Sequence, residues 1–202
     1  MQYEALAEQL VHAGRVLHDL GMVPATSGNF SARINDNEFA ATVSGKHKGR
    51  LSSDDIMRVD NRGKSLDGKV PSAEVGLHAR IYQRFPETGA ILHVHSIFST
   101  LLSRVVEDNV VLENYELLKA FPGIKTHEVR VTVPVFANDQ DIDRLAGQVD
   151  EFFSRHDTIP AYLIRSHGLY TWGKTVHDAL HYVEALEFLF RCELTLQGVI
   201  KP

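Results

Sequence analysis

Apolar side chains recur every three or four residues near both ends of the chain, with polar residues between them. In residues 3–20 the apolar positions are Leu6, Leu10, Ala13, Val16, Leu17 and Leu20. In residues 176–196 they include Leu180, Val183, Leu186, Leu189 and Phe190. This spacing predicts an amphipathic helix near each end of the chain, and Gly21 provides a natural stop for the first one.

Shorter helical patterns occupy the middle of the chain. Ser72 is a candidate N-cap for a helix that runs to about Phe85, where Pro86 ends it. Residues 97–104, 113–120 and 139–156 also carry helical spacing. We therefore expect helices to be interspersed among the strands.

Short apolar or alternating runs between these helices predict strands. Residues 29–34 and 39–43 flank the turn-forming sequence Asn35-Asp36-Asn37 and predict a hairpin. Residues 90–95, 129–135 and 161–164 have a similar apolar character. Hairpin strands mixed with helices favour an α/β three-layer sandwich with a mixed, largely antiparallel central sheet over a doubly wound parallel sheet.

Composition limits the size and class of the protein. A chain of 202 residues with 44% apolar content can bury a substantial core, and without repeats or linkers we expect one domain over residues 1–202. A formal net charge of −5 argues against a nucleic-acid surface. No apolar run reaches the roughly 18 residues of a membrane span. The single cysteine, Cys192, excludes an intrachain disulfide, so we expect a cytoplasmic protein.

The strand-like run Ala90-Ile91-Leu92 leads into the sequence His93-Val94-His95. Side chains two apart on a strand point to the same face, so both imidazoles can reach one metal ion. His167 follows another apolar run and is the best candidate for a third ligand. Three histidines with an open fourth position are typical of a catalytic zinc site. The alternative is that these are ordinary histidines of a sheet.

Three loops of small residues supply a second kind of candidate site. They are residues 26–29, 44–49 and 71–72. Hydroxyl groups, backbone N–H groups and lysine ammonium groups are what a phosphate monoester needs for its oxygens. Each loop alone could be an ordinary turn, and the phosphate interpretation depends on their occurring together. The chain has no glycine-rich nucleotide fingerprint.

Five short motifs together resemble the class II aldolase/adducin-like family over about residues 20–190. They are Ser27-Gly28-Asn29-Phe30-Ser31, Ser44-Gly45, Pro71-Ser72-Ala73-Glu74, His93-Val94-His95 and His167-Gly168-Leu169. The resemblance implies an α/β/α sandwich that assembles as a cyclic homotetramer, with zinc-dependent active sites near the subunit interfaces.

The resemblance also implies roles for particular residues. His93, His95 and His167 match the ligands of one Zn²⁺ ion per subunit. We expect a small phosphorylated ketose as the substrate. The positions that match its phosphate site are Gly28, Asn29, Ser44, Gly45 and Ser72, with Lys46 added from the same loop.

Within the family the chain is most similar to members that remove water from a ketose phosphate. The segments that favour this zinc-dependent hydro-lyase reaction are residues 44–49, 113–119, 134–142 and 185–193. Glu116 falls where such dehydratases carry a catalytic acid/base. Glu74 is a second candidate, as a proton shuttle or a partner of the metal ligands. An aldolase or epimerase of the family and a non-enzymatic scaffold stay open as alternatives.

Overall fold

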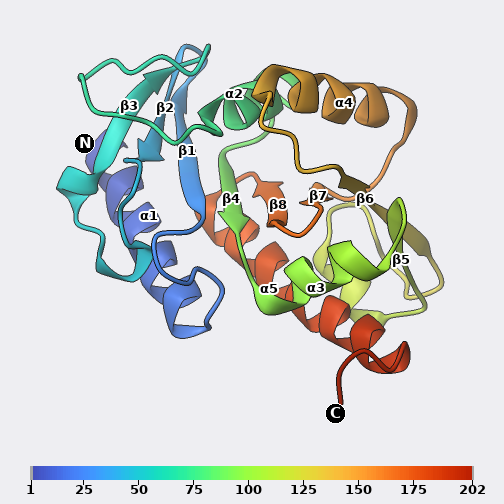
Figure 1. Cartoon of the computed structure of the whole chain (residues 1–202). Helices are drawn as coiled ribbons and strands as arrows, with labels where there is room; N and C mark the ends of the chain where they lie inside the picture. The colour runs from blue at the N-terminus through green and yellow to red at the C-terminus, as the bar shows by residue number, and fades with distance from the viewer. Residues whose placement is uncertain (1, 202) are drawn as a thin grey trace.

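The computed structural model describes residues 2–201, and its centre is a sheet of eight strands (Figure 1). Their order across the sheet is β3-β2-β1-β4-β8-β7-β6-β5. The strands are β1 (Asn29–Asn35), β2 (Glu38–Thr42), β3 (Ile56–Asp60), β4 (Ala90–Val94), β5 (Asn109–Glu113), β6 (Arg130–Phe136), β7 (Ala161–Ile164) and β8 (Gly168–Gly173).

The sheet is mixed, as the sequence predicts. β6 and β7 run parallel, and the other neighbouring strands of residues 2–201 run antiparallel. β1 and β2 form the predicted hairpin, with Ser31 opposite Ala41. β4 lies between β1 and β8, and its register sets His93 opposite Asn29 on one side and Tyr170 on the other.

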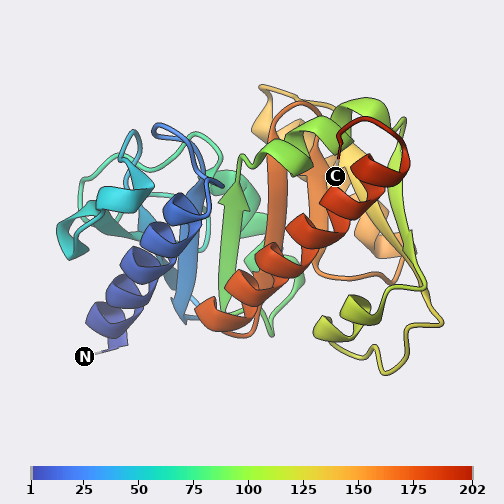
Figure 2. The same ribbon diagram turned by 90° about the horizontal axis from the view of Figure 1, so that it is seen from below.

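Helices cover both faces of the sheet and complete the predicted three-layer sandwich. α1 (Gln2–Asp19), α3 (Ile97–Val105) and α5 (Val176–Leu196) pack on one face, where Figure 2 shows α1 and α5 crossing the sheet. α2 (Val75–Arg84) and α4 (Ile142–Arg155) lie together on the other face (Figure 1). Among residues 2–201, no helix combines the length and apolar character needed to cross a membrane.

Alternation along β4 explains which face receives its histidine. Leu92 and Val94 belong to the core beneath α1, α3 and α5, whereas Ile91 belongs to the core beneath α2 and α4. Because the side-chain period of a strand is two, His93 points to the same face as Ile91. Its ring stacks on Tyr170 of β8, with centroids 4.0 Å apart and planes at 15°.

The predicted start of α2 is wrong by about two residues. Ser72 is not the N-cap, because it forms a turn in which Val75 N–H donates to its carbonyl at 3.1 Å. Glu74 is the N-cap, with φ −89° and ψ 6°, and its side chain makes no capping hydrogen bond. The carboxylate of Glu74 is therefore left for other partners.

The predicted helix over residues 113–120 is only partly present. Glu113 ends β5, and a short 3₁₀ helix covers Glu116–Ala120. β5 pairs with β6 at the edge of the sheet, and this non-local pairing overrides the local helical spacing. The other helical ranges expected in the middle of the chain are confirmed as α3 and α4.

Candidate metal and phosphate site

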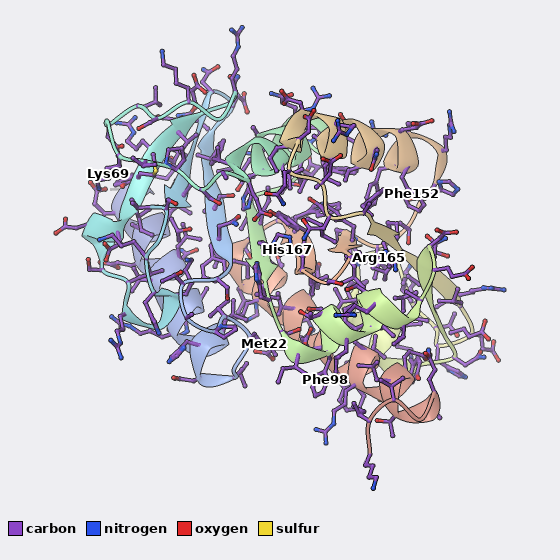
Figure 3. All side chains as sticks on the ribbon, viewed as in Figure 1. Met22, Lys69, Phe98, Phe152, Arg165 and His167 are labelled. Carbon is purple, nitrogen blue, oxygen red and sulfur yellow. The ribbon has the colours of Figure 1, made fainter. Side chains whose placement is uncertain are left out.

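Three imidazoles from two separate segments meet at the end of β4. His95 Nε2 lies 2.8 Å from His93 Nε2, and His167 Nε2 lies 3.3 Å from the same atom. His93 is the fourth residue of β4, His95 directly follows that strand, and His167 occupies the turn between β7 and β8. Figure 3 shows His167 in the middle of the molecule, next to β4. Among the described residues, these three histidines form the cluster able to hold a metal ion.

The hydrogen bond made by His93 Nδ1 shows that the other ring nitrogen, Nε2, faces the cluster with a lone pair. His93 Nδ1 lies 3.0 Å from the carbonyl oxygen of Leu169. A carbonyl only accepts, so Nδ1 carries the proton and Nε2 carries the lone pair. This tautomer is the one that a metal-binding histidine adopts when its other nitrogen is held by a carbonyl.

His93 and His95 are neutral at physiological pH. Burial, followed by the neighbouring rings of His95 and His167, holds the pKa of His93 well below its ordinary value. Burial also lowers the pKa of His95 to about 4. Converging nitrogen lone pairs repel one another unless a cation lies among them. The donor set therefore fits a divalent metal ion that accepts imidazole ligands.

Contacts from α3 fix the turn that carries His167. Ser166 adopts the left-handed region with φ 58°, an uncommon conformation for a residue with a side chain. Its N–H donates to Ser103 Oγ at 2.9 Å, and Thr100 Oγ1 donates to the carbonyl of His167 at 3.1 Å. The turn is thus held in a strained conformation that aims His167 at the other two rings.

A buried carboxyl group supports the residue next to His95. Ser96 is the N-cap of α3, where its Oγ accepts from Ser99 N–H. The Ser96 hydroxyl also donates to Glu187 of α5. Burial raises the pKa of the Glu187 carboxyl to about 7. This contact ties the end of β4 to the long C-terminal helix.

Two glycines allow the backbone segments beside β4 to approach it closely. A Cβ atom added at Gly28 would lie 2.6 Å from the carbonyl oxygen of His93, and Gly28 has φ +75°. A Cβ atom at Gly168 would overlap the carbonyl oxygen of Val94. Neither position has room for a side chain.

Glu74 adds a carboxylate to the three histidines. Its Oε2 lies 3.4 Å from His93 Nε2, and its Oε1 lies 3.4 Å from His167 Nε2. The N-terminus of α2 follows directly, and its dipole favours a negative charge there. The carboxylate stands where it can meet a metal ion or a substrate atom bound beside one.

A chain of hydrogen bonds runs from Glu74 into the core. Because the Glu74 carboxylate only accepts, each donor and acceptor along the chain can be assigned. Asn29 Nδ2 donates to Glu74 at 2.9 Å, so Asn29 Oδ1 accepts from His78 Nε2 at 2.5 Å. His78 Nδ1 must then accept from the Ser31 hydroxyl at 2.7 Å, and Tyr82 donates to Ser31 at 2.8 Å. Burial lowers the pKa of His78 to about 3, which keeps the ring neutral in this chain.

Five of the six predicted phosphate-binding residues line one cavity of about 440 Å³ together with part of the histidine cluster. Ser44 and Gly45 come from the loop after β2, and Ser72 comes from the turn before α2. The full set from the sequence prediction that lines this cavity is Gly28, Asn29, Ser44, Gly45, Ser72, Glu74, His95 and His167. These positions lie far apart in the sequence and close together in the fold.

Lys46 and Glu116 lie elsewhere. The ammonium group of Lys46 pairs with Asp55 at 2.8 Å, and the side chain is 49% exposed. Glu116 is 70% exposed and pairs with Lys119 at 2.5 Å. Lys119 is the main cause that lowers the pKa of the Glu116 carboxyl. The Glu116 carboxylate also lies 3.5 Å from His127 Nδ1. Its described contacts do not include His93, His95 or His167.

Several residues of the site were missed by the sequence analysis. Asn138, Asp139 and Gln140 from the loop before α4 line the cavity. Lys48 lines it too and belongs to the candidate loop over residues 44–49, in which the sequence analysis preferred Lys46. His78 supports Glu74 from within α2. A signal existed for His78, because it shares the buried face of the helix with Leu77 and Ile81, where a polar side chain needs a partner. The irregular loop around Lys48 has no period that predicts which lysine points inward.

The fold and the site define a class of protein in which three converging histidines lie beside a cavity lined by small polar residues, on an α/β/α sandwich. Residues 8–194 match the model of the Class II Aldolase and Adducin N-terminal domain family. The chain belongs to this family.

The most informative relatives share more than half of their residues with this chain. Methylthioribulose-1-phosphate dehydratase from Methylococcus capsulatus is 59% identical over 198 residues, which cover 98% of this chain and 97% of that protein. The enzyme of the same name from Pseudomonas paraeruginosa is 54% identical, with 95% and 94% coverage.

Solved structures agree with the fold. The Escherichia coli protein YgbL superimposes with a TM-score of 0.83 at 24% identity, over 97% of this chain and 91% of that chain. The L-fuculose-1-phosphate aldolase of Thermus thermophilus gives 0.77 at 26% identity, over 98% and 97%. The predicted three-layer sandwich of the class II aldolase type is confirmed.

Proposed function

We propose that this chain removes water from 5-methylthioribulose 1-phosphate to give 2,3-diketo-5-methylthiopentyl 1-phosphate, a step of methionine salvage. The observation that carries the proposal is the near-full-length identity of 59% to a dehydratase named for this substrate. The cluster of His93, His95 and His167 beside a cavity lined by small polar residues supports it.

We propose one Zn²⁺ ion per subunit, held by the three histidines. Bound zinc supplies Lewis acidity, which makes a proton on the carbon next to a ketone easier to remove. The neutral rings of His93 and His95 and the inward lone pair of His93 support this assignment. The loops that carry Gly28, Ser44 and Ser72 would hold the phosphate group through hydroxyl and backbone N–H donors.

The reaction needs one proton to leave C3 and one to reach the departing C4 hydroxyl, so that water is released and an enol tautomerises to the diketone. We assign removal of the C3 proton to Glu74, because its carboxylate lies beside the metal ligands. We assign protonation of the hydroxyl to Glu116, which matches the acid/base position of the dehydratases.

The exposure of Glu116 leads to a proposal about assembly. Glu116, Leu117 and Phe188 line a surface hollow of about 710 Å³, and Phe188 is 57% exposed. We propose a homotetramer in which this surface meets a second copy and brings Glu116 to the neighbour's histidines. The remaining expectations, one domain over residues 1–202 and a cytoplasmic location, stay proposals that the continuous sheet and the lone Cys192 support.

The direct test gives zinc-loaded protein 5-methylthioribulose 1-phosphate and follows the diketone phosphate, with a chelator-treated sample alongside. We expect product in the first sample and little in the second. L-Fuculose 1-phosphate is the comparison substrate, because the Thermus thermophilus aldolase is 26% identical. Cleavage of that sugar without diketone formation would favour an aldolase.

Glu74→Gln should retain zinc and the fold while lowering turnover by about 10²-fold or more, because an amide cannot accept the proton. Asn29 Nδ2 now donates to Oε2 of Glu74 at 2.9 Å, and the glutamine Oε1 atom can accept the same bond. Metal content and single-turnover rates measure the effect. Glu8→Gln on the exposed face of α1 is the matched control. Unchanged turnover of the Glu74 variant would contradict the assignment.

A further inference from the structure

Lys48 is buried inside the protein, whereas most lysines are exposed at protein surfaces. Only 2% of the residue is exposed. Its Nζ donates to the carbonyl oxygens of Thr26 at 3.0 Å and of Lys46 at 2.7 Å. Burial lowers the pKa of the Lys48 ammonium group to about 8.

The two hydrogen bonds leave one donor of Lys48 for another partner. An ammonium group has three N–H donors, and the described partners of Lys48 are two carbonyl groups. The residue also lines the 440 Å³ cavity of the histidine site. A buried charge whose neighbours are two neutral carbonyls is poorly compensated, so an anion in the cavity would complete its environment.

The ammonium group lies at the junction of two loops of the cavity. Thr26 is two residues before Gly28, and Lys46 directly follows Gly45. Both glycines line the cavity, and Lys48 bridges the backbones of their loops. A group bound between these loops would therefore lie against the Lys48 ammonium.

The charges of the cavity show why a cation is needed there. The carboxylates of Glu74 and Asp139 line the cavity. Asp139 pairs with Arg144, so the carboxylate that repels an anionic substrate is that of Glu74. Of the described residues that line the cavity, Lys48 alone is a lysine or an arginine. Hydroxyl and N–H donors orient a phosphate, and a charged donor forms the stronger hydrogen bond to it.

We propose that Lys48 binds the phosphate group of the substrate and is the charged donor of the phosphate site. The proposal rests on the proposed function insofar as the substrate is a phosphate monoester. It replaces Lys46, whose ammonium group pairs with Asp55, in the role that the sequence analysis gave to that residue.

The test compares zinc-loaded Lys48→Met with the unaltered protein and with Lys64→Met, an exposed control. Inorganic phosphate is titrated as a ligand, with thermal shift and isothermal titration calorimetry as readouts. We expect phosphate affinity to fall by about tenfold or more in Lys48→Met, because a charge-assisted hydrogen bond is lost. Binding of 5-methylthioribulose, which has no phosphate, should stay the same.

Comparing inorganic phosphate with 5-methylthioribulose shows whether Lys48 contacts the phosphate or only holds the two loops together. An equal loss of affinity for both would mean that Lys48 only joins the loops, and unchanged phosphate affinity would equally overturn the proposal. If Lys48→Met does not fold, the unaltered protein is acetylated with and without inorganic phosphate. Peptide mass spectrometry should show protection of Lys48 relative to Lys64, and equal modification would contradict the proposal.

Phosphate binding requires no turnover, so this experiment is independent of the dehydratase assay. Loss of phosphate affinity in Lys48→Met, from a protein that fails to form the diketone, would uphold the phosphate contact and reject the proposed reaction. Diketone formation by the unaltered protein, with unchanged phosphate affinity in Lys48→Met, would uphold the proposed reaction and reject the phosphate contact.

Discussion

His95→Ala is expected to lose its zinc and its dehydratase activity together. The substitution removes one of three converging nitrogens, and His95 Nε2 lies only 2.8 Å from His93 Nε2. We expect turnover to fall by at least about 10²-fold, because a Lewis acid contributes several kcal/mol to such a reaction. Metal content by mass spectrometry and diketone formation are measured on the same preparation.

His177→Ala is the matched control for this prediction, since His177 is an exposed histidine of α5. The control should bind zinc and turn over substrate like the unaltered protein. A His95→Ala protein that is free of metal and fully active would disprove the role of the metal. Circular dichroism should show the same fold in both variants, because His95 lies after the end of β4 and the strand itself is unchanged.

Glu116→Gln is expected to lower turnover by about 10²-fold or more while zinc content and stability stay the same. The stability prediction follows from exposure: Glu116 is 70% exposed and its ion pair with Lys119 is a surface pair, which contributes little. Glu128→Gln, an exposed residue of a nearby loop, is the matched control. Near-normal turnover would leave Glu74 as the acid/base that the sequence analysis ranked second.

A mixture of inactive variants tests whether Glu116 serves a neighbouring protomer. His95→Ala and Glu116→Gln chains are co-expressed so that they share tetramers. In a ring, each site that combines intact histidines with an intact neighbouring Glu116 is active, so about a quarter of normal activity should return. If Glu116 acts within its own protomer, no site is complete and activity stays at the level of the separate variants.

The pair His93 and His95 could be predicted because a strand has a fixed period. Residues two apart in an extended chain point to the same face, and His95 directly follows Val94, the last residue of β4. His167 needed more, because it reaches the site only through the turn between β7 and β8. Its inclusion depended on the apolar run over residues 161–164 before it, and the family motif then supported it. The structure brings His167 Nε2 to 3.3 Å from His93 Nε2.

Other features depend on contacts that no local pattern contains. β3, β5 and β8 are short strands whose pairing is decided by their neighbours across the sheet. Asn29 has a motif that suggests a phosphate contact, yet its side-chain amide joins His78 to Glu74. The conformation of an irregular loop decides that Lys48 lines the cavity, whereas Lys46 pairs with Asp55.

The close packing of β4 predicts where the chain tolerates no variation. Gly28 and Gly168 are the points where neighbouring backbone nearly touches the carbonyl groups of His93 and Val94. Even alanine would have to push the histidine-bearing strand aside. In a scan of every single substitution, these two glycines should rank with the metal ligands for loss of activity, although neither contributes a side chain to the chemistry. Intolerance at Gly168 would therefore report the shape of the backbone and not a catalytic role.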